Sequence, residues 1–340
     1  MIPTLLLAPM GGGPGTVELA AAVCNAGGLG AFAGAYLTPA QLRVEIARLR
    51  VLTDRPFNVN LFAGGYHREP GRDPAPILRV MEEVHQALRI APPELPEIPP
   101  DPFEEQLRVV LDAKPAVFSF TFGVPSDSAM RRLKEAGIFI IGTATSAREA
   151  ELLIEAGVDT IVAQGAEAGA HRGTWVEEGM IPTLELVRLI KGKPVIASGG
   201  IMTRADVQAA LQAGAVAVQM GTAFLLCPEA GTSTAYRRAL EEARESVITR
   251  AFSGRAARGL RNAFVDRIAE REELILDFPA QNSLTRPMRA ASAAQDNPEY
   301  LSLWAGTGAG RAREMPAGEL VKELTSTTRG QKPFTPCGFE

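Results

Sequence analysis

Short apolar runs recur along the first two-thirds of the chain and predict eight buried strands. Each run is apolar on both faces of an extended chain, as in parallel strands that are covered on both sides. A half-exposed strand would instead alternate between apolar and polar residues. The runs span residues 4–10, 29–35, 57–63, 116–122, 138–144, 160–166, 194–200 and 215–222.

Between the apolar runs lie stretches whose apolar residues have helical spacing. Two of them, SAREAELLIEAG and TRADVQAALQAG, begin with a residue that can cap a helix and end in Ala-Gly. Eight strands alternating with helices predict a (β/α)8 TIM barrel. An open dinucleotide-binding sheet is disfavoured, because PMGGGPGT after the first run lacks the G-x-G-x-x-G spacing. Similar helical stretches occupy residues 16–27, 38–53, 128–137 and 183–192.

Two regions interrupt the repeat and suggest a division of the chain. Residues 64–115 are predicted to be an insertion after the third strand, with prolines at 91–102 that exclude regular helix there. From residue 241 onward the pattern is helical and polar, and SLTRPMRAASAAQDNPEYLSLWAG predicts a helix-loop-helix. We therefore predict a barrel over 1–240, a helical extension covering the barrel mouth over 241–325, and a weakly ordered tail over 326–340.

Composition and charge exclude several classes of function. The net charge is −4 with a pI near 5.7, and Lys and Arg are spread along the chain, which argues against nucleic-acid binding. The sequence contains no run of 18 or more apolar residues, so no membrane span is expected. The amino-terminal residues lack the pattern of a signal peptide. The three cysteines, Cys24, Cys227 and Cys337, form no C-x-x-C pair. Neither a zinc site nor a disulfide framework is expected, which favours a cytoplasmic protein.

Glycine-rich motifs follow the last two predicted strands. Barrel enzymes bind ligands at the carboxyl ends of their strands, and the loops after strands seven and eight commonly hold a phosphate. SGGI (198–201) and QMGT (219–222) leave backbone N–H groups open to close approach by a ligand. A single glycine pair could simply turn the chain, but paired motifs on adjacent strands favour the phosphate interpretation. We therefore predict a phosphate site at Gly199, Gly200, Gly221 and Thr222.

Two amides end otherwise apolar strands. Asn60 and Gln164 could each bind the ring edge of a planar cofactor or bond neighbouring backbone groups. Together with a phosphate site they favour FMN lying across the barrel mouth. Asn58 should face the same side as Asn60, two residues away. Met10 and Met220 could line the flavin, although core filling is the default for methionine.

His171 stands apart from the other two histidines of the chain. His67 falls in the predicted insertion loop and His85 on a predicted helix, which favours structural roles for both. His171 instead lies in AQGAEAGAHRG, where the small neighbours leave room for a substrate. An imidazole titrates near neutral pH, so His171 is the predicted catalytic residue. Within the same loop, Glu167 is expected to have a structural role and Arg172 to face solvent.

In their order along the chain, these motifs resemble the nitronate monooxygenases, formerly called 2-nitropropane dioxygenases. The resemblance runs from residue 5 to about 325, and one departure is visible. The family usually has a second glycine before the histidine, where this chain has Ala170. The motifs are APMGGG, NVNLF, FGVP, QGAEAGAHRG, ASGGIM, QMGT and QNSLTRP.

The resemblance implies an FMN-dependent enzyme that uses no metal. Such enzymes oxidise alkyl nitronates, for example propionate 3-nitronate, with O₂ to a carbonyl compound and nitrite. It also implies that His171 is the active-site base or the hydrogen-bond partner of the nitro group. With Gly199 added from the glycine motifs, the expected FMN contacts are Met10, Gly11, Asn60, Gln164, Gly169, Gly199, Gly200, Gln219, Met220, Gly221 and Thr222.

Other interpretations stay open at this point. The nearest is an FMN-dependent NAD(P)H reductase of quinones or enoyl thioesters on the same barrel, and a non-catalytic flavin-binding protein is a third. An IMP-dehydrogenase-like barrel would need a nucleophilic cysteine, whereas the surroundings of Cys227 suggest a structural role. Tyr300 and Trp304 are interpreted as helix-packing residues rather than as substrate contacts. A homodimer is a candidate assembly.

Overall fold

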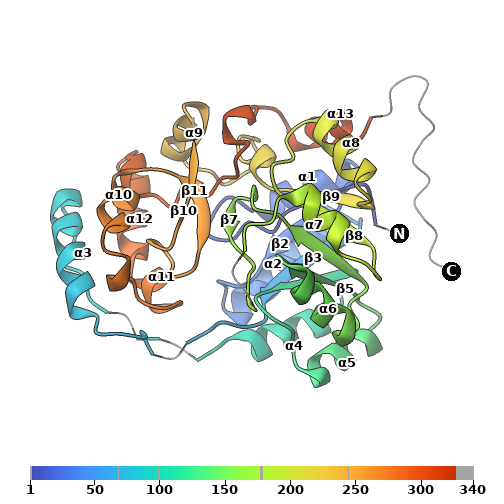
Figure 1. Cartoon of the computed structure of the whole chain (residues 1–340), viewed down its shortest axis with the longest axis horizontal. Helices are drawn as coiled ribbons and strands as arrows, with labels where there is room; N and C mark the ends of the chain where they lie inside the picture. The colour runs from blue at the N-terminus through green and yellow to red at the C-terminus, as the bar shows by residue number, and fades with distance from the viewer. Residues whose placement is uncertain are drawn as a thin grey trace.

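Each of the eight apolar runs forms a strand in the computed structural model (Figure 1). The structure describes residues 2–67, 69–95, 97–98, 100–176, 179–243 and 245–326. The strands are β1 (Leu5–Leu7), β2 (Gly30–Ala33), β3 (Phe57–Phe62), β4 (Val117–Thr121), β5 (Phe139–Ala144), β6 (Thr160–Gln164), β8 (Val195–Ser198) and β9 (Ala217–Met220).

The eight strands pair in parallel in the order β1-β9-β8-β6-β5-β4-β3-β2. The two ends of this order meet, because Leu6 forms a parallel bridge with Leu29 just before β2. The Leu7 N–H donates to the Leu29 carbonyl at 2.9 Å, and the Leu29 N–H donates to the Leu5 carbonyl at 3.0 Å. The sheet therefore closes, and the predicted TIM barrel is confirmed.

Inward-facing side chains fill the barrel interior. They form a separate buried cluster of seven residues, one on or next to each barrel strand except β3. Because this cluster blocks the interior, a ligand can enter only above it, at the carboxyl ends of the strands. The cluster consists of Leu6, Leu29, Val117, Ile141, Val162, Ile196 and Ala217.

An outer ring of helices covers the barrel, and its last member is α13, which packs against α1 and α8. Side-chain caps begin several of these helices, as the sequence predicts: Thr16 caps α1, Ser146 caps α6 and Thr203 caps α8. The ring contains α1 (Val17–Asn25), α2 (Pro39–Leu52), α4 (Phe103–Ala113), α5 (Asp127–Glu135), α6 (Ala147–Ala156), α7 (Thr183–Leu189), α8 (Arg204–Gln212) and α13 (Ala317–Thr325).

A second hydrophobic core lies beside the barrel, on the left in Figure 1. Helix α3 (Ala75–Leu88) from the predicted insertion contributes Ile77, Val80, Met81, Val84 and Leu88 to it. Its partners are α10 (Ala263–Ala269), α11 (Ala280–Leu284) and α12 (Arg286–Ala294).

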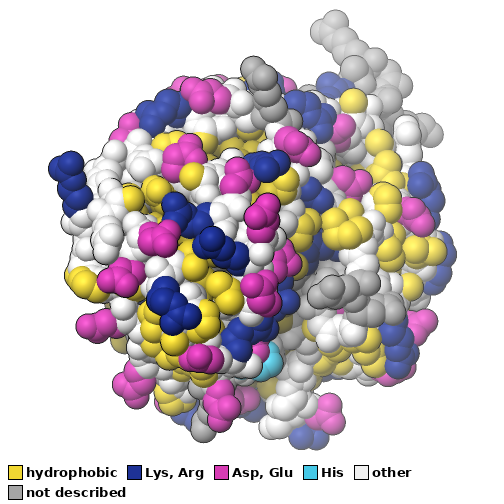
Figure 2. All heavy atoms as spheres, turned by 60° about the vertical axis from the view of Figure 1, so that its left-hand side comes forward, with side chains coloured by type: hydrophobic (Ala, Val, Ile, Leu, Met, Phe, Trp, Pro, Cys, Tyr) yellow, Lys and Arg dark blue, Asp and Glu magenta, His cyan; other side chains and the backbone are white. Residues whose placement is uncertain are grey.

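Basic and acidic side chains are interspersed on the face turned forward in Figure 2. The boundaries proposed at residues 240 and 325 stay predictions.

The region after residue 241 contains more extended chain than the sequence suggested. Strand β11 (Ala257–Leu260) is the central strand of a small antiparallel sheet. It pairs with β10 (Ser246–Thr249) on one side and with the two-residue strand β7 (Ala170–His171) on the other. Helix α12 forms where the first helix was predicted, but the expected second helix is only the 3₁₀ turn η3 (Pro298–Tyr300). Beyond it the chain is extended, and Trp304 bridges to Gly259 on β11.

The remaining described elements are α9 (Thr234–Glu241) and the 3₁₀ turns η1 (Thr222–Phe224), η2 (Glu272–Leu274) and η4 (Ala309–Arg311). Among the described residues, no helix has the length and apolar character needed to cross a bilayer. The tail from residue 327 to 340, which includes Cys337, lies outside the described residues.

Candidate active site

A single pocket at the carboxyl ends of the barrel strands brings together all twelve residues that the sequence singled out for the site. Residues from β1, β3, β6, β8 and β9 or from the loops after them meet there, as the barrel geometry requires. The twelve are Met10, Gly11, Asn60, Gln164, Gly169, His171, Gly199, Gly200, Gln219, Met220, Gly221 and Thr222.

The pocket wall also contains residues that sequence reasoning missed. Tyr36, Phe62 and Phe122 follow or end strands β2, β3 and β4, so the strand-end rule could have found them. Tyr236 and Trp304 reach the pocket from the carboxyl-terminal region, and no local pattern signals their approach. Tyr300 and Trp304 both pack against the second core, as interpreted, and Trp304 also borders the pocket.

The loops after β8 and β9 form a cradle of free backbone donors. The N–H groups of Gly199, Gly200 and Ile201 donate no hydrogen bond within the described part of the chain. Gly199 and Gly200 have φ values of 126° and 70°, which favour glycine. The 3₁₀ turn η1 begins directly after Gly221, so its first N–H groups also lack internal acceptors. This arrangement suits a phosphate group.

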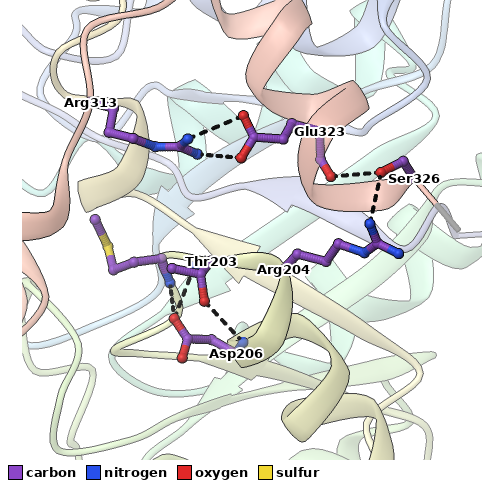
Figure 3. Close-up of polar contacts among 7 residues, drawn as sticks. Thr203, Arg204, Asp206, Arg313, Glu323 and Ser326 are labelled. Atoms are coloured by element: carbon purple, nitrogen blue, oxygen red, sulfur yellow. Dashed lines mark hydrogen bonds and ion pairs between the residues drawn. The ribbon is translucent and has the colours of Figure 1, made fainter. Parts of the chain in front are cut away.

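Helix α8 supports the cradle from behind (Figure 3). The Asp206 carboxylate accepts the N–H groups of Met202 and Thr203, both at 2.9 Å. It also accepts from the Arg311 guanidinium at 3.0 Å. Burial alone would raise the pKa of Asp206, but these backbone donors, Thr203 and Arg311 together lower it. Arg311 also donates to the Gly200 carbonyl at 3.0 Å. The amino end of α8 is thus capped by its own side chains, which leaves the glycine loop as the anion-binding part.

Helix α13 is tied to the same region. Arg313 forms a two-pronged ion pair with Glu323, and Arg204 at the start of α8 donates to the Ser326 hydroxyl at 3.4 Å (Figure 3). The Ser326 hydroxyl in turn donates to the Glu323 carbonyl at 3.0 Å. These contacts are exposed, so each contributes little stability. They fix the last helix of the ring beside the cradle.

The two predicted amides are held by neighbouring groups. Gln164 donates to the His171 carbonyl at 3.0 Å and accepts from the Gly173 N–H at 2.7 Å. Asn58 and Asn60 both donate to the Ser119 hydroxyl at 2.9 Å, which confirms that they face the same side. Gln164 therefore fixes the loop that carries His171 while it also lines the pocket.

His171 is positioned by strand pairing and by one side-chain hydrogen bond. Its backbone pairs with Ala257 on β11, and its Nε2 lies 2.8 Å from the Ser253 hydroxyl. The other ring nitrogen, Nδ1, has no hydrogen-bond partner among the described residues, which leaves it available to a ligand. Three aromatic rings surround the imidazole, with centroid distances of 6.2 Å to Phe62, 6.0 Å to Phe122 and 5.8 Å to Trp304.

The environment of His171 changes its expected protonation. Burial, together with the positive charges of Arg255 and Arg289, lowers the pKa of the imidazole from 6.5 to about 3. Its side chain is only partly buried because it borders an open pocket, but the protein surrounds it closely enough to desolvate it. The expectation that His171 titrates near neutral pH is therefore wrong. At pH 7 the ring is neutral and acts through hydrogen bonds.

This lowered pKa predicts a loss of stability in mild acid. Between pH 6.5 and about 3 the unfolded chain binds a proton at His171 that the folded protein does not bind. The stabilising contribution is therefore complete above pH 6.5 and is lost as the pH falls toward 3. The free energy of unfolding, measured in urea, should fall more steeply below pH 6.5 for the unmodified protein than for His171→Asn. A constant difference between the two down to pH 4 would contradict the lowered pKa.

The charged neighbours of His171 both have structural roles. Glu167 accepts the N–H and the hydroxyl of Thr183 at 2.9 and 2.7 Å, as its predicted structural role requires. Arg172 is only 4% exposed and donates to the Gly165 carbonyl at 2.5 Å and the Gln164 carbonyl at 3.3 Å. The prediction that Arg172 faces solvent is therefore wrong, since its guanidinium holds the carboxyl end of β6.

Ala170 adopts a backbone conformation that favours glycine. Its φ is 63°, in the left-handed region where a Cβ atom is strained. Ala170→Gly should therefore raise the free energy of unfolding, by up to about 1 kcal/mol, measured by urea denaturation. Ala166→Gly in the same loop has no positive φ to relieve and should lower it instead. Equal effects of the two substitutions would show that Ala170 is not strained.

No group of three or more His, Cys, Asp or Glu side chains suited to a metal ion occurs among the described residues. The described cysteines, Cys24 and Cys227, are free and buried, and burial raises the pKa of both thiols, which makes them poor nucleophiles.

Comparison with known proteins gives consistent results across the chain. The family model described as nitronate monooxygenase matches residues 1–327. A nitronate monooxygenase from Pseudomonas aeruginosa is 42% identical over 341 residues, covering 96% of this chain and 96% of that protein. A solved structure of nitroalkane oxidase from Streptomyces ansochromogenes has a TM-score of 0.87 at 38% identity, covering 95% and 94% of the two chains. FabK from Thermotoga maritima is less similar, with a TM-score of 0.73 at 29% identity over 95% and 91%.

Proposed function

This chain belongs to the nitronate monooxygenase family, and we propose that it uses bound FMN to oxidise alkyl nitronates with O₂ to a carbonyl compound and nitrite. It is accordingly an oxidoreductase. The observation that carries the substrate and cofactor proposal is the joint placement of the glycine cradle, the strand-end amides and His171 around one pocket.

The residues present fit FMN. The free N–H groups of Gly199, Gly200 and Ile201 would bind its phosphate. A Cβ atom at Gly199 would lie 2.7 Å from the Thr183 hydroxyl, and one at Gly200 would lie 3.0 Å from the Glu167 Cβ, so side chains there would force the loop to move. Asn60 and Gln164 would face the ring from the strand ends, and Met10 and Met220 border the same pocket. When bound, FMN supplies the electron-accepting chemistry that the oxidation requires.

His171 would hold the nitronate. In the neutral tautomer with its proton on Nδ1, Nε2 accepts from the Ser253 hydroxyl at 2.8 Å and the Nδ1–H can donate to the nitronate. A base with a pKa of about 3 is too weak to remove a carbon-bound proton from a neutral nitroalkane efficiently. The protein should therefore prefer preformed nitronates, which need no deprotonation, and His171 orients the substrate through a hydrogen bond.

The aromatic wall limits access of water to this position. Phe62, Phe122 and Trp304 surround the imidazole, and Tyr236 donates a hydrogen bond to the Trp304 carbonyl. In such an apolar setting the hydrogen bond from His171 to an anionic substrate is stronger than it would be in water.

Nitrite release and oxygen uptake with propionate 3-nitronate test the proposal, with NAD(P)H oxidation measured in parallel. The expected result is stoichiometric nitrite and carbonyl product without any need for NAD(P)H. Rapid anaerobic bleaching of the bound flavin by NADH or NADPH, with no nitrite formed from nitronates, would instead establish the reductase alternative. Flavin binding without either activity would establish the non-catalytic alternative.

We also propose a cytoplasmic location, in keeping with the free thiols of Cys24 and Cys227. A homodimer stays a prediction, to be measured by light scattering of the purified protein.

A further inference from the structure

Tyr36 occupies a part of the pocket wall that the proposed mechanism does not use. It lies in the loop after β2, with its ring edge-on to Phe62 at a centroid distance of 5.5 Å. Phe62 also contacts His171 at 6.2 Å, so the same ring packs against both. A Cβ atom at Gly11 would lie 2.9 Å from the Tyr36 ring, which explains why glycine suits that position. The fold therefore makes room for this phenol beside the catalytic histidine.

The Tyr36 hydroxyl has no partner among the described residues, and its partly buried ring borders the pocket. A tyrosine hydroxyl in such a position normally has a hydrogen-bond partner. On the same pocket wall, the Tyr236 hydroxyl donates to the Trp304 carbonyl. Burial raises the pKa of the Tyr36 phenol, although Arg289, Arg255 and Arg286 partly oppose this effect. The phenol is therefore protonated at neutral pH and can donate a hydrogen bond to a ligand.

Two partly buried arginines, Arg255 and Arg289, lie behind this part of the wall without acidic partners among the described residues. The Arg255 guanidinium lies 3.7 Å from the centroid of Phe122 and 4.4 Å from that of Phe278, and donates to the Gly64 carbonyl at 2.8 Å. Arg289 donates to the carbonyl and side chain of Asn282 at 2.7 and 3.0 Å. All these acceptors are uncharged.

Neither arginine forms an ion pair within the described ranges of the chain. Burial lowers the pKa of each guanidinium to about 10, so both stay positive at neutral pH. The exposed Asp101 is the one carboxylate whose charge acts on Arg255, and Tyr36 acts on both arginines. This side of the pocket therefore carries positive charge that the protein itself does not neutralise, and such a site favours an anion.

We propose that Tyr36 is a substrate-binding residue whose hydroxyl, backed by Arg255 and Arg289, binds an acidic group on the carbon chain of the nitronate. This inference rests on the proposed function. His171 would hold the nitronate group and Tyr36 the second anionic group, so the pair selects substrates that carry a carboxylate. Tyr36 is then a determinant of specificity. Removal of its hydroxyl should affect nitronates that carry a carboxylate more than nitronates that lack one.

Two nitronates of matched skeleton test this assignment in the FMN-loaded protein. Propionate 3-nitronate carries the carboxylate, and the nitronate of 1-nitropropane has a methyl group in its place. Tyr36→Phe should raise KM for propionate 3-nitronate about tenfold with kcat little changed, because it removes a hydrogen bond to a charged group. KM for the plain nitronate should change less than twofold. Equal losses on both substrates would overturn the proposal.

Tyr236→Phe is the matched control, because it removes a hydroxyl from the same wall that already has a partner. It should affect the two nitronates equally. Arg289→Lys and Arg289→Met test the charge, since both lose the guanidinium bonds to Asn282 and only methionine loses the charge. The preference for the carboxylated nitronate should persist in the lysine variant and fall in the methionine variant. An equal fall in both would exclude a role for the charge.

A binding measurement separates failure of this inference from failure of the proposed function. Thermal unfolding with 3-nitropropionate or 1-nitropropane reports binding without turnover. 3-Nitropropionate should raise the melting temperature of the unmodified protein more than that of Tyr36→Phe. 1-Nitropropane should shift the melting temperatures of the two proteins equally. That result without nitrite release would support the anion site and reject the oxidation. Nitrite release without that difference would reject the anion site alone.

Discussion

Replacement of His171 by Asn should lower kcat/KM for nitronate oxidation about 100-fold or more while FMN binding changes less than twofold. Asparagine keeps a polar atom near the position of Nδ1, but it loses the Nε2 contact with Ser253 that orients the ring. It also leaves unfilled the space between Phe62, Phe122 and Trp304, so the remaining polar atom is no longer held toward the substrate. The cradle at Gly199 and Gly200 is independent of the ring, so the cofactor should remain bound. Steady-state nitrite release and flavin fluorescence titration measure the two effects.

His67→Asn is the matched control for this substitution. His67 is exposed and does not border the active pocket, so neither kcat/KM nor FMN affinity should change. Unchanged nitronate turnover in His171→Asn would remove the catalytic role assigned to His171. Loss of flavin binding in the same variant would mean that the ring supports the cofactor instead of the substrate.

The sequence predicted the strands and their functional ends because both depend on local patterns. A buried parallel strand is apolar over its length, so all eight runs were visible. The carboxyl ends of barrel strands converge on one face, so the sequence alone assigns Gln164, Gly199 and His171 to one pocket. The residues of the small sheet β7-β10-β11 gave no such signal, because its strands are short and partly polar.

What the sequence could not provide are effects that depend on groups distant in the chain. The neutral state of His171 results from burial and from Arg255 and Arg289, which follow it by more than 80 residues. Ser253 and Trp304 reach the imidazole through the same carboxyl-terminal region. Arg172 was expected to face solvent as a surface arginine, whereas it is buried and donates to the carbonyl groups at the end of β6. Tertiary proximity decided each of these cases.

Gly199→Ala should weaken FMN binding about 100-fold or more and lower the free energy of unfolding by roughly 2 kcal/mol. Gly199 has a φ of 126°, which residues with a side chain rarely adopt. An added Cβ would lie 2.7 Å from the Thr183 hydroxyl and 2.9 Å from the Ala168 nitrogen, so the loop must move. Any such movement turns the N–H groups of the cradle away from the phosphate. Flavin titration and urea denaturation measure the two losses separately.

Gly214→Ala distinguishes backbone strain from damage to the cradle. Gly214 has a comparable φ of 110°, but an added Cβ there would meet nothing within 4 Å, and the residue lies in the turn between α8 and β9, away from the pocket. This variant should lose about 1–2 kcal/mol of stability through strain alone and bind FMN normally. If both variants weakened FMN binding equally, global destabilisation would explain the loss. If Gly199→Ala bound FMN normally, the phosphate would not lie on the β8 loop, and the η1 turn would have to hold it alone.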